Sequence, residues 1–390
     1  MKPSATLAMT ARANDRRQAG HPVIGLSAGE PDFDTPVEIA EAAIQAIRDG
    51  FTHYTDNAGI LELREAICEK LLSDNNIEYD PSQILCSNGA KQSVAQAISV
   101  LCQAGDEVVI PAPYWVSYPE MARFAGAIPV GIATDAESGY RITPEQLDAA
   151  LTPNSRILIL CSPSNPTGGV YSPDELRALA DVLQRWPRVT VISDEIYELI
   201  MYDQTHLSMA SIDGMLERTV TVNGFSKAYA MTGWRLGYMA APSSIVKACS
   251  KLQSQFTSAP SSISQKAGVQ ALGMNKQPVR KMVQEFRKRR DFVLSKLSQI
   301  PDVHCPIPDG AFYVFPDISA YLGSSSRNGR KIVSSEDLCF YLLDDHDVAL
   351  VPGAAFGGPS GIRISYAASM DNLTEAMSRI KTAFELLRVA

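Results

Sequence analysis

A lysine and an arginine, eight residues apart, follow an apolar run near the middle of this chain. Lys227 comes shortly after the run 219–222, and Arg235 follows it among glycines and small residues. Burial disfavours the charged form of a lysine, and the neutral amine is a nucleophile that forms a Schiff base with a carbonyl compound. Arg235 suits an anionic group on that compound. The alternative is that Lys227 is a solvated surface residue, as most lysines are.

A carboxylate ends another apolar run. Asp194 follows Val191, Ile192 and Ser193. A carboxylate at such a position requires a cationic or hydrogen-bonding partner. The partner is either a lysine, an arginine or a helix N-terminus of the protein, or the protonated pyridine nitrogen of pyridoxal 5′-phosphate (PLP). In the second case the ring becomes an electron sink, and Lys227 becomes the anchor of its carbonyl group.

Three other segments place polar residues at the ends of apolar runs. The sequence 87–91, Ser-Asn-Gly-Ala-Lys, opens a helix whose N–H groups either bind phosphate or simply begin the helix. Asn165 lies in a turn rich in proline and glycine, and it either starts that turn or donates to a ligand oxygen. Arg363 lies inside an apolar strand, where it meets either an acid of the protein or a substrate carboxylate.

The composition narrows the class of protein. The chain has 390 residues, of which 45% are hydrophobic and 20% charged, and a net charge of −8. We therefore expect a soluble globular protein that binds neither nucleic acid nor a membrane. The seven cysteines are scattered and indicate a reducing compartment without a disulfide framework. The five histidines form no recognisable ligand motif, so no metal site is expected.

The alternation of apolar runs with amphipathic segments predicts an α/β fold. We expect a large domain with a mostly parallel, seven-stranded sheet covered by helices. The predicted strands are 84–87, 107–110, 128–131, 156–161, 190–193, 219–222 and 237–240. The predicted helices include 90–103, 173–184 and 244–255. In such sheets ligands bind beyond the carboxyl ends of the strands, where the polar residues above lie.

The pattern changes from about residue 278, which predicts a second, smaller α/β domain. It contains a long helix at 280–297, strands at 311–316, 348–351 and 362–366, and a last helix from Met370. The predicted division is an N-terminal arm that joins the small domain (1–40), a large PLP-binding domain (41–285) and a small C-terminal domain (286–390). A cleft between two domains is a usual place for a small-molecule site.

Six motifs together resemble the class I aminotransferases of PLP fold type I. They are SAGEPDFDTP (27–36), PAPYWVSYPEM (111–121), SPSNPTGGVY (162–171), SDEIYE (193–198), NGFSKAYAMTGWRLGY (223–238) and IRISYA (362–367). The resemblance covers essentially the whole chain. Within the family it points to the bacterial-type aspartate aminotransferases, a subgroup that includes the plastid and bacterial bifunctional aspartate/glutamate–prephenate aminotransferases.

The resemblance implies a role for each matching residue. Lys227 would be the Schiff-base lysine and the general acid and base. The other residues implied to bind PLP are Asp194 at the pyridine nitrogen, Asn165 and Tyr197 at the phenolic oxygen, Trp115 on the ring face, and Gly89, Ala90 and Arg235 at the phosphate, helped by Tyr54 from a partner subunit. Lys91 and Ser226 are also implied to bind the cofactor. The residues implied to bind the substrate are Arg363 and Gly29 at the α-carboxylate, Lys91 and Thr6 at the distal carboxylate, and also Trp115 and Asn165.

The implied activity is a ping-pong transamination in a homodimer with shared active sites. The amino group would move between glutamate or aspartate and a keto acid: prephenate, which yields arogenate, or oxaloacetate or 2-oxoglutarate. A kynurenine-type aminotransferase, a PLP-dependent β-lyase and a PLP-binding regulatory module are alternatives, whereas a nicotinamide dehydrogenase lacks its glycine fingerprint. The implied compartment is the plastid stroma, after removal of a transit peptide, or the bacterial cytoplasm.

Overall fold

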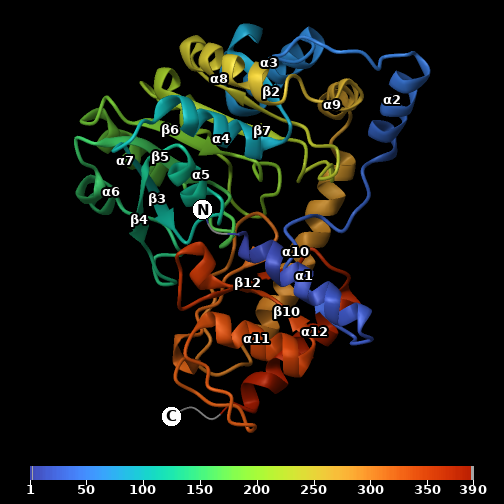
Figure 1. The fold of residues 1–390 in the computed structure, drawn as a ribbon, viewed down its shortest axis with the longest axis vertical. Coiled ribbons are helices and arrows are strands. Elements are labelled where there is room, and N and C mark those ends of the chain that lie inside the picture. Colours follow the sequence, from blue (N-terminus) through green and yellow to red (C-terminus); the bar gives the residue numbers. More distant parts are fainter. Residues whose placement is uncertain (2, 388–390) are drawn as a thin grey trace.

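A seven-stranded sheet forms the centre of the larger domain in the computed structural model, which describes residue 1 and residues 3–387 (Figure 1). The strand order is β2-β8-β7-β6-β5-β3-β4, and only β8 runs antiparallel to its neighbours. The strands are β2 (Ile84–Ser87), β3 (Glu107–Ala112), β4 (Ile128–Ala133), β5 (Ser155–Cys161), β6 (Thr190–Asp194), β7 (Thr219–Gly224) and β8 (Gly237–Ala240). The predicted sheet is confirmed. Five strands are one or two residues longer than predicted, because the hydrogen-bond ladder continues past the apolar run.

Helices cover both faces of this sheet because successive strand residues point to opposite sides. Val108 and Ile110 belong to a hydrophobic cluster with residues of α4, α5 and α8, whereas Val109 between them belongs to a cluster with residues of α6 and α7. The helices of this domain are α2 (Val37–Arg48), α3 (Leu61–Asn75), α4 (Ala90–Leu101), α5 (Tyr118–Phe124), α6 (Pro144–Ala150), α7 (Pro173–Gln184), α8 (Ser243–Phe256) and α9 (Ser262–Gly273). Of the three helices predicted here, α4 ends two residues early and α8 is one residue longer at each end.

The smaller domain lies below the sheet in Figure 1 and is reached through α10 (Gln277–Leu297). Its other elements are β9 (Tyr313–Val314), α11 (Ser335–His346), β10 (Val348–Ala349), β11 (Val351–Pro352), β12 (Ile362–Ser365) and α12 (Met370–Glu385). The single strand predicted at 348–351 is wrong: β10 pairs with β1 (Ile24–Gly25), and β11 pairs with β12. The predicted strand 311–316 shrinks to β9. The predicted boundary at residue 285 falls inside α10, and the division into domains stays a prediction.

The N-terminal helix α1 (Ala5–Gln18) was not predicted, and it packs on the smaller domain. Ser4 caps it by accepting from the Leu7 N–H at 3.5 Å. Arg12 donates to both carboxylate oxygens of Asp344 at 2.9 Å, and Arg16 donates to Asp347 at 2.9 Å. With the pairing of β1 and β10, these contacts join the start of the chain to its last fifth.

The described residues contain no helix that is both long and apolar enough to cross a membrane. All seven cysteines carry free thiols, as predicted.

Replacing Leu179, which is fully buried in α7, by alanine is expected to lower the free energy of unfolding by about 2–5 kcal/mol, because the side chain leaves a cavity. Leu72→Ala in α3 is the matched control, since that leucine is exposed and its loss should change stability by about 0.5 kcal/mol or less. Denaturant unfolding measures both. Equal effects of the two variants would show that Leu179 is not in the core.

Candidate functional site

A cavity of about 390 Å³ opens at the carboxyl ends of β5, β6 and β7, between the sheet and the smaller domain. This size is typical of small-molecule sites. Twelve of the predicted site residues line it: Thr6, Gly29, Ala90, Lys91, Trp115, Asn165, Asp194, Tyr197, Ser226, Lys227, Arg235 and Arg363. The structure thus brings together residues that are up to 357 positions apart in the sequence.

Lys227 follows β7 and reaches into this cavity. Its Nζ donates a hydrogen bond to the carbonyl oxygen of Gly29. Burial lowers the pKa of Lys227 to about 8, and the positive charge of Arg363 acts in the same direction. An amine with this pKa is partly neutral near pH 7, so it can attack a carbonyl carbon and can also carry a proton.

Asp194 ends β6 and is 5% exposed. Its Oδ2 accepts a hydrogen bond from the Tyr118 hydroxyl at 2.6 Å, and its Oδ1 accepts from the Ile196 N–H at 3.3 Å. Burial raises the pKa of Asp194 to about 6, although these two hydrogen bonds oppose the rise. None of the described lysines or arginines forms an ion pair with this carboxylate, so it keeps the capacity to pair with a cationic group of a ligand.

Arg363 lies in β12 and is 2% exposed. It donates to Asn165 Oδ1 at 2.9 Å and to the Ser27 carbonyl at 2.6 Å, and its Nε has no partner in the described part of the chain. The sequence left an internal acid open as its partner, but no described carboxylate lies within 4.0 Å of it. A buried cation without an anion is costly, and a bidentate carboxylate of a ligand would satisfy it.

Aromatic rings hold the Arg363 guanidinium in place. Its Cζ lies 4.7 Å from the centre of the Tyr313 ring and 5.0 Å from that of Phe356. The Tyr313 hydroxyl also shares a hydrogen bond of 2.8 Å with that of Tyr197. Sequence reasoning missed Tyr313, because nothing in the local sequence shows that β9 lies against β12.

Asn165 belongs to a tight turn that follows β5. The turn is closed by two backbone hydrogen bonds of 2.9 Å between Ser164 and residues 168 and 169. Since Asn165 accepts from Arg363 through Oδ1, its amide N–H groups are left to donate to a ligand. Its position couples Arg363 to the end of β5.

An anion cradle lies at the start of α4. Gly89 is the N-cap at φ 85° and offers no side chain to cap the helix. A Cβ at this position would lie 2.5 Å from Arg235 Nη2, so only glycine allows the guanidinium to approach the helix N-terminus. Arg235 is fixed by donating to the Thr232 carbonyl at 2.7 Å. Helix N–H groups and a guanidinium together favour a phosphate.

Lys91 and Trp115 stand beside this cradle. Lys91 Nζ lies 4.8 Å from the centre of the Trp115 ring, and burial followed by the charge of Arg235 lowers the pKa of Lys91. Trp115 meets the Tyr118 ring edge to face at 5.2 Å. Tyr118, which sequence reasoning missed, therefore connects the tryptophan to Asp194; its signal was its place in the motif 111–121.

Two predicted residues do not line the cavity. Gly89 lies directly behind Ala90, where the close approach of Arg235 explains its presence. Tyr54 is fully exposed and is not among the residues that line the cavity. Its expected role, as a residue supplied by a partner subunit, stays a prediction.

Several lining residues were not predicted, among them Ser4, Leu7 and Thr10 from α1 or its cap, and Glu30. The three N-terminal residues were missed because α1 was not recognised as a helix. Glu30 accepts a hydrogen bond from Thr232 at 2.8 Å. Glu30 could have been identified from the sequence, because it lies in the motif 27–36.

A family model described as "Aminotransferase class I and II" matches residues 21–380. The chain is 55% identical over 392 residues to a "Bifunctional aspartate aminotransferase and glutamate/aspartate-prephenate aminotransferase" of Petunia hybrida, covering 100% of this chain and 82% of the relative. It is 48% identical over 383 residues to an "Aspartate/prephenate aminotransferase" of Cereibacter sphaeroides, covering 98% and 96%.

Solved structures share the whole fold. The crystal structure of the aspartate aminotransferase from Rhizobium meliloti matches with a TM-score of 0.96 at 45% identity, covering 100% of this chain and 98% of that chain. The aspartate aminotransferase from Thermus thermophilus with maleate matches with a TM-score of 0.91 at 40% identity, covering 98% and 97%. The expected fold type is therefore confirmed.

Tyr118→Phe is expected to raise the pKa of Asp194 above about 6, because the variant loses a hydrogen bond that stabilises the carboxylate. The measurement is a pH titration of the apoprotein carrying carbon-13-labelled aspartate, followed by NMR. Tyr313→Phe is the control, since it removes a buried hydroxyl that contacts Tyr197 instead of Asp194. An unchanged or lower pKa in Tyr118→Phe would contradict the assignment of this hydrogen bond.

Proposed function

We propose that this chain, which belongs to the class I and II aminotransferase family, is a PLP-dependent enzyme. It moves an amino group between glutamate or aspartate and a keto acid, with prephenate or oxaloacetate as acceptor. Both the family membership and the site support this proposal. One observation carries the proposal: Lys227, Asp194 and Arg363 converge on one cavity without neutralising one another. A nucleophilic amine, a carboxylate and a carboxylate-binding cation are the three groups that this chemistry requires.

The residues present fit PLP. The anion cradle of Gly89, Ala90 and Arg235 suits the phosphate, because a Cβ at Gly89 would fill the space that Arg235 occupies. Asp194 suits the pyridine nitrogen. Tyr197 and Asn165 suit the phenolic oxygen. Trp115 suits the ring face, and Ser226 suits the phosphate beside the cradle.

When bound, PLP supplies an electron sink that stabilises negative charge at the substrate Cα. Asp194 serves this chemistry by holding a cation beside its buried carboxylate. Lys227 would accept the proton of the substrate Cα on its Nζ and pass it on. A pKa of about 8 suits this task, because the nitrogen can both take up and release a proton near neutral pH. The hydrogen bond to Gly29 orients that nitrogen, and α1 shields the cavity from bulk water on the side of Thr6 and Thr10.

Two cations in the cavity suit a dicarboxylic substrate. Arg363 binds the α-carboxylate through its free Nε and its guanidinium edge. Lys91 and Thr6 face the distal carboxylate from two different elements. Two of the relatives are named for aspartate and prephenate, and the Thermus thermophilus structure is titled with maleate, a dicarboxylate. These names and this charge pattern support aspartate, glutamate and prephenate as substrates.

A homodimer is part of the proposal. Full exposure of Tyr54 in one subunit supports a role in the partner's site. The free thiols support a reducing compartment, such as the plastid stroma or the bacterial cytoplasm.

The direct test compares kcat/KM for glutamate and aspartate as donors with prephenate, oxaloacetate and phenylpyruvate as acceptors. We expect prephenate and oxaloacetate to exceed phenylpyruvate. A preference for phenylpyruvate would reject the dicarboxylate proposal. Release of pyruvate or ammonia from cysteine conjugates in place of transamination would indicate a β-lyase.

Lys227→Ala should lower turnover by about 10²- to 10⁴-fold or more, because the variant lacks both the nucleophile and the proton carrier. Binding of PLP, measured by equilibrium dialysis, should persist through the other contacts. Lys227→Arg is a matched control that keeps a cation but not a nucleophile, and it should be equally inactive. Near-wild-type turnover of either variant would refute the role of Lys227.

Lys91→Ala should lower kcat/KM for aspartate and prephenate by about 10- to 100-fold, as expected for the loss of a charged hydrogen bond of about 1.5–3 kcal/mol. Phenylpyruvate, which lacks the distal carboxylate, should be affected much less. Lys247→Ala, on the exposed face of α8, is the control and should change neither. An equal loss for both substrate classes would reject this role for Lys91.

A further inference from the structure

The segment 194–198 presents functional side chains on one side and buried carboxylates on the other. Asp194 and Tyr197 line the cavity. Glu195 and Glu198 are 1% and 8% exposed and do not line it. Two buried carboxylates directly behind the candidate site require an explanation, because burial of an unpaired charge is costly.

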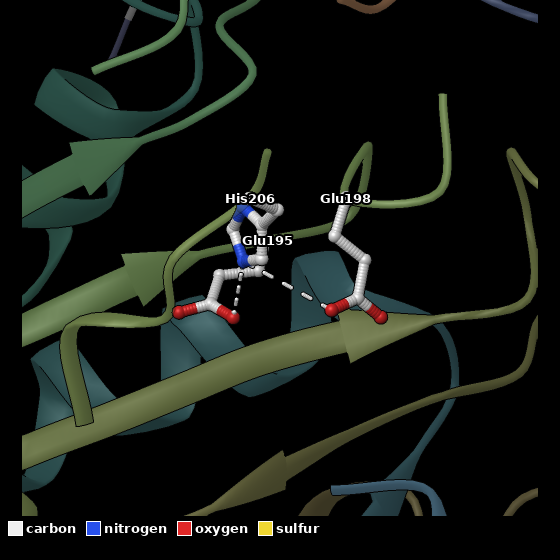
Figure 2. A group of neighbouring side chains, drawn as sticks. All are labelled: Glu195, Glu198 and His206. Carbon is white, nitrogen blue, oxygen red and sulfur yellow. Dashed lines mark hydrogen bonds and ion pairs between the residues drawn. The ribbon is translucent and has the colours of Figure 1, made fainter. Parts of the chain in front are cut away.

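A buried charge cluster, formed by Glu195, Glu198, His206 and Lys70, surrounds these carboxylates. Figure 2 shows the His206 imidazole beside both glutamates. Its Nε2 lies 3.0 Å from Glu195 Oε2 and 4.0 Å from Glu198 Oε2. Lys70, from α3, forms an ion pair with Glu198 Oε1.

Neutral donors complete the hydrogen bonding of the buried charge cluster. Glu195 Oε1 accepts from the hydroxyls of Ser193 at 2.8 Å and Ser208 at 2.7 Å. Glu198 accepts from the amides of Asn75 at 2.8 Å and Asn223 at 2.7 Å. Each of the four carboxylate oxygens therefore has a hydrogen-bonding or ionic partner.

The same three side chains in Figure 2 have the spacing of metal ligands, with ligand atoms within 4.8 Å of one another. The contacts argue against a metal ion at this position. A divalent cation would have to displace the Lys70 ammonium from Glu198 and the serine hydroxyls from Glu195. The cluster already contains the positive charge that a metal would supply.

The pKa values of Glu198 and His206 are shifted in the direction that favours ion pairs within the cluster. Burial alone would raise the pKa of Glu198. Lys70 and then His206 act in the opposite direction with a larger combined effect, so the pKa of Glu198 lies below its usual value. Burial alone would lower the pKa of His206. Glu195 and then Glu198 act in the opposite direction with a larger combined effect, so the pKa of His206 lies above its usual value. The two carboxylates thus face the Lys70 ammonium and the His206 imidazole, and they favour the protonated form of that imidazole.

Building on the PLP site proposed above, we propose that the buried charge cluster is a positioning device that fixes Asp194 and Tyr197 against the cofactor. Its anchors come from α3, from β7 and from the loop around residue 206, so the segment 194–198 is held from three directions. The turn itself is closed by the Glu198 N–H, which donates to the Glu195 carbonyl at 2.9 Å. A displacement of about 1 Å at such a site can cost about 10²-fold in rate.

The experiment measures PLP affinity of the apoprotein, together with the absorption and circular dichroism of bound PLP, for the wild type, Glu195→Gln, His206→Gln and the double variant. Each single variant removes one side of the contact between Glu195 and His206 and leaves the other buried side chain without that partner, so we expect PLP affinity to fall about 10-fold and the dichroism of the bound cofactor to weaken. The double variant removes a whole ion pair, so it should recover most of the affinity. Ser208→Ala, which removes only a neutral donor, should show a smaller loss.

Leu179→Ala controls for stability, because it weakens the fold away from the cavity and should leave PLP affinity within about twofold of the wild type. Single variants that bind PLP as the wild type does, or a double variant no better than the singles, would overturn the positioning role. One equivalent of divalent metal retained after dialysis against a chelator would also overturn it. If the wild type itself fails to bind PLP, the proposed function falls, which is a distinct result.

Discussion

The guanidinium of Arg363 is buried in the wall of the cavity, and no carboxylate among residues 1 and 3–387 lies beside it. Burial of a cation is tolerated only where neutral acceptors and aromatic faces surround it, and here Asn165, the Ser27 carbonyl, Tyr313 and Phe356 supply them. These partners come from the larger domain, the N-terminal segment and the smaller domain. The three parts of the chain therefore meet around Arg363, and its positive charge is left available to a ligand.

The parallel strands of the large sheet position the other polar groups of this site. Because β5, β6 and β7 run in the same direction, their carboxyl ends place Asn165, Asp194 and Lys227 at one edge. Burial then acts on the two ionisable groups in opposite senses, raising the pKa of Asp194 and lowering that of Lys227. The same low-polarity environment thus favours the neutral form of both groups.

Much of this arrangement was predictable, because buried parallel strands are apolar runs and the residues after them carry the chemistry. The strand before Lys227 and the carboxylate at the end of β6 can both be recognised from the local sequence alone. Tyr118, Tyr313 and His206 were not predictable in the same way, since their partners lie 76, 116 and 11 residues away and only folding brings them together. Helix α1 escaped prediction because it has only two buried residues among many polar ones.

The contact between Arg12 and Asp344 spans 332 residues. During synthesis on a ribosome, the N-terminal residues emerge first, yet α1 has no docking surface until α11 and β10 have been made. The larger domain can close its sheet long before that moment. The cavity walls formed by α1 and by Arg363 in β12 are therefore assembled late, and a nascent chain cannot enclose a ligand there before residue 363 has been made.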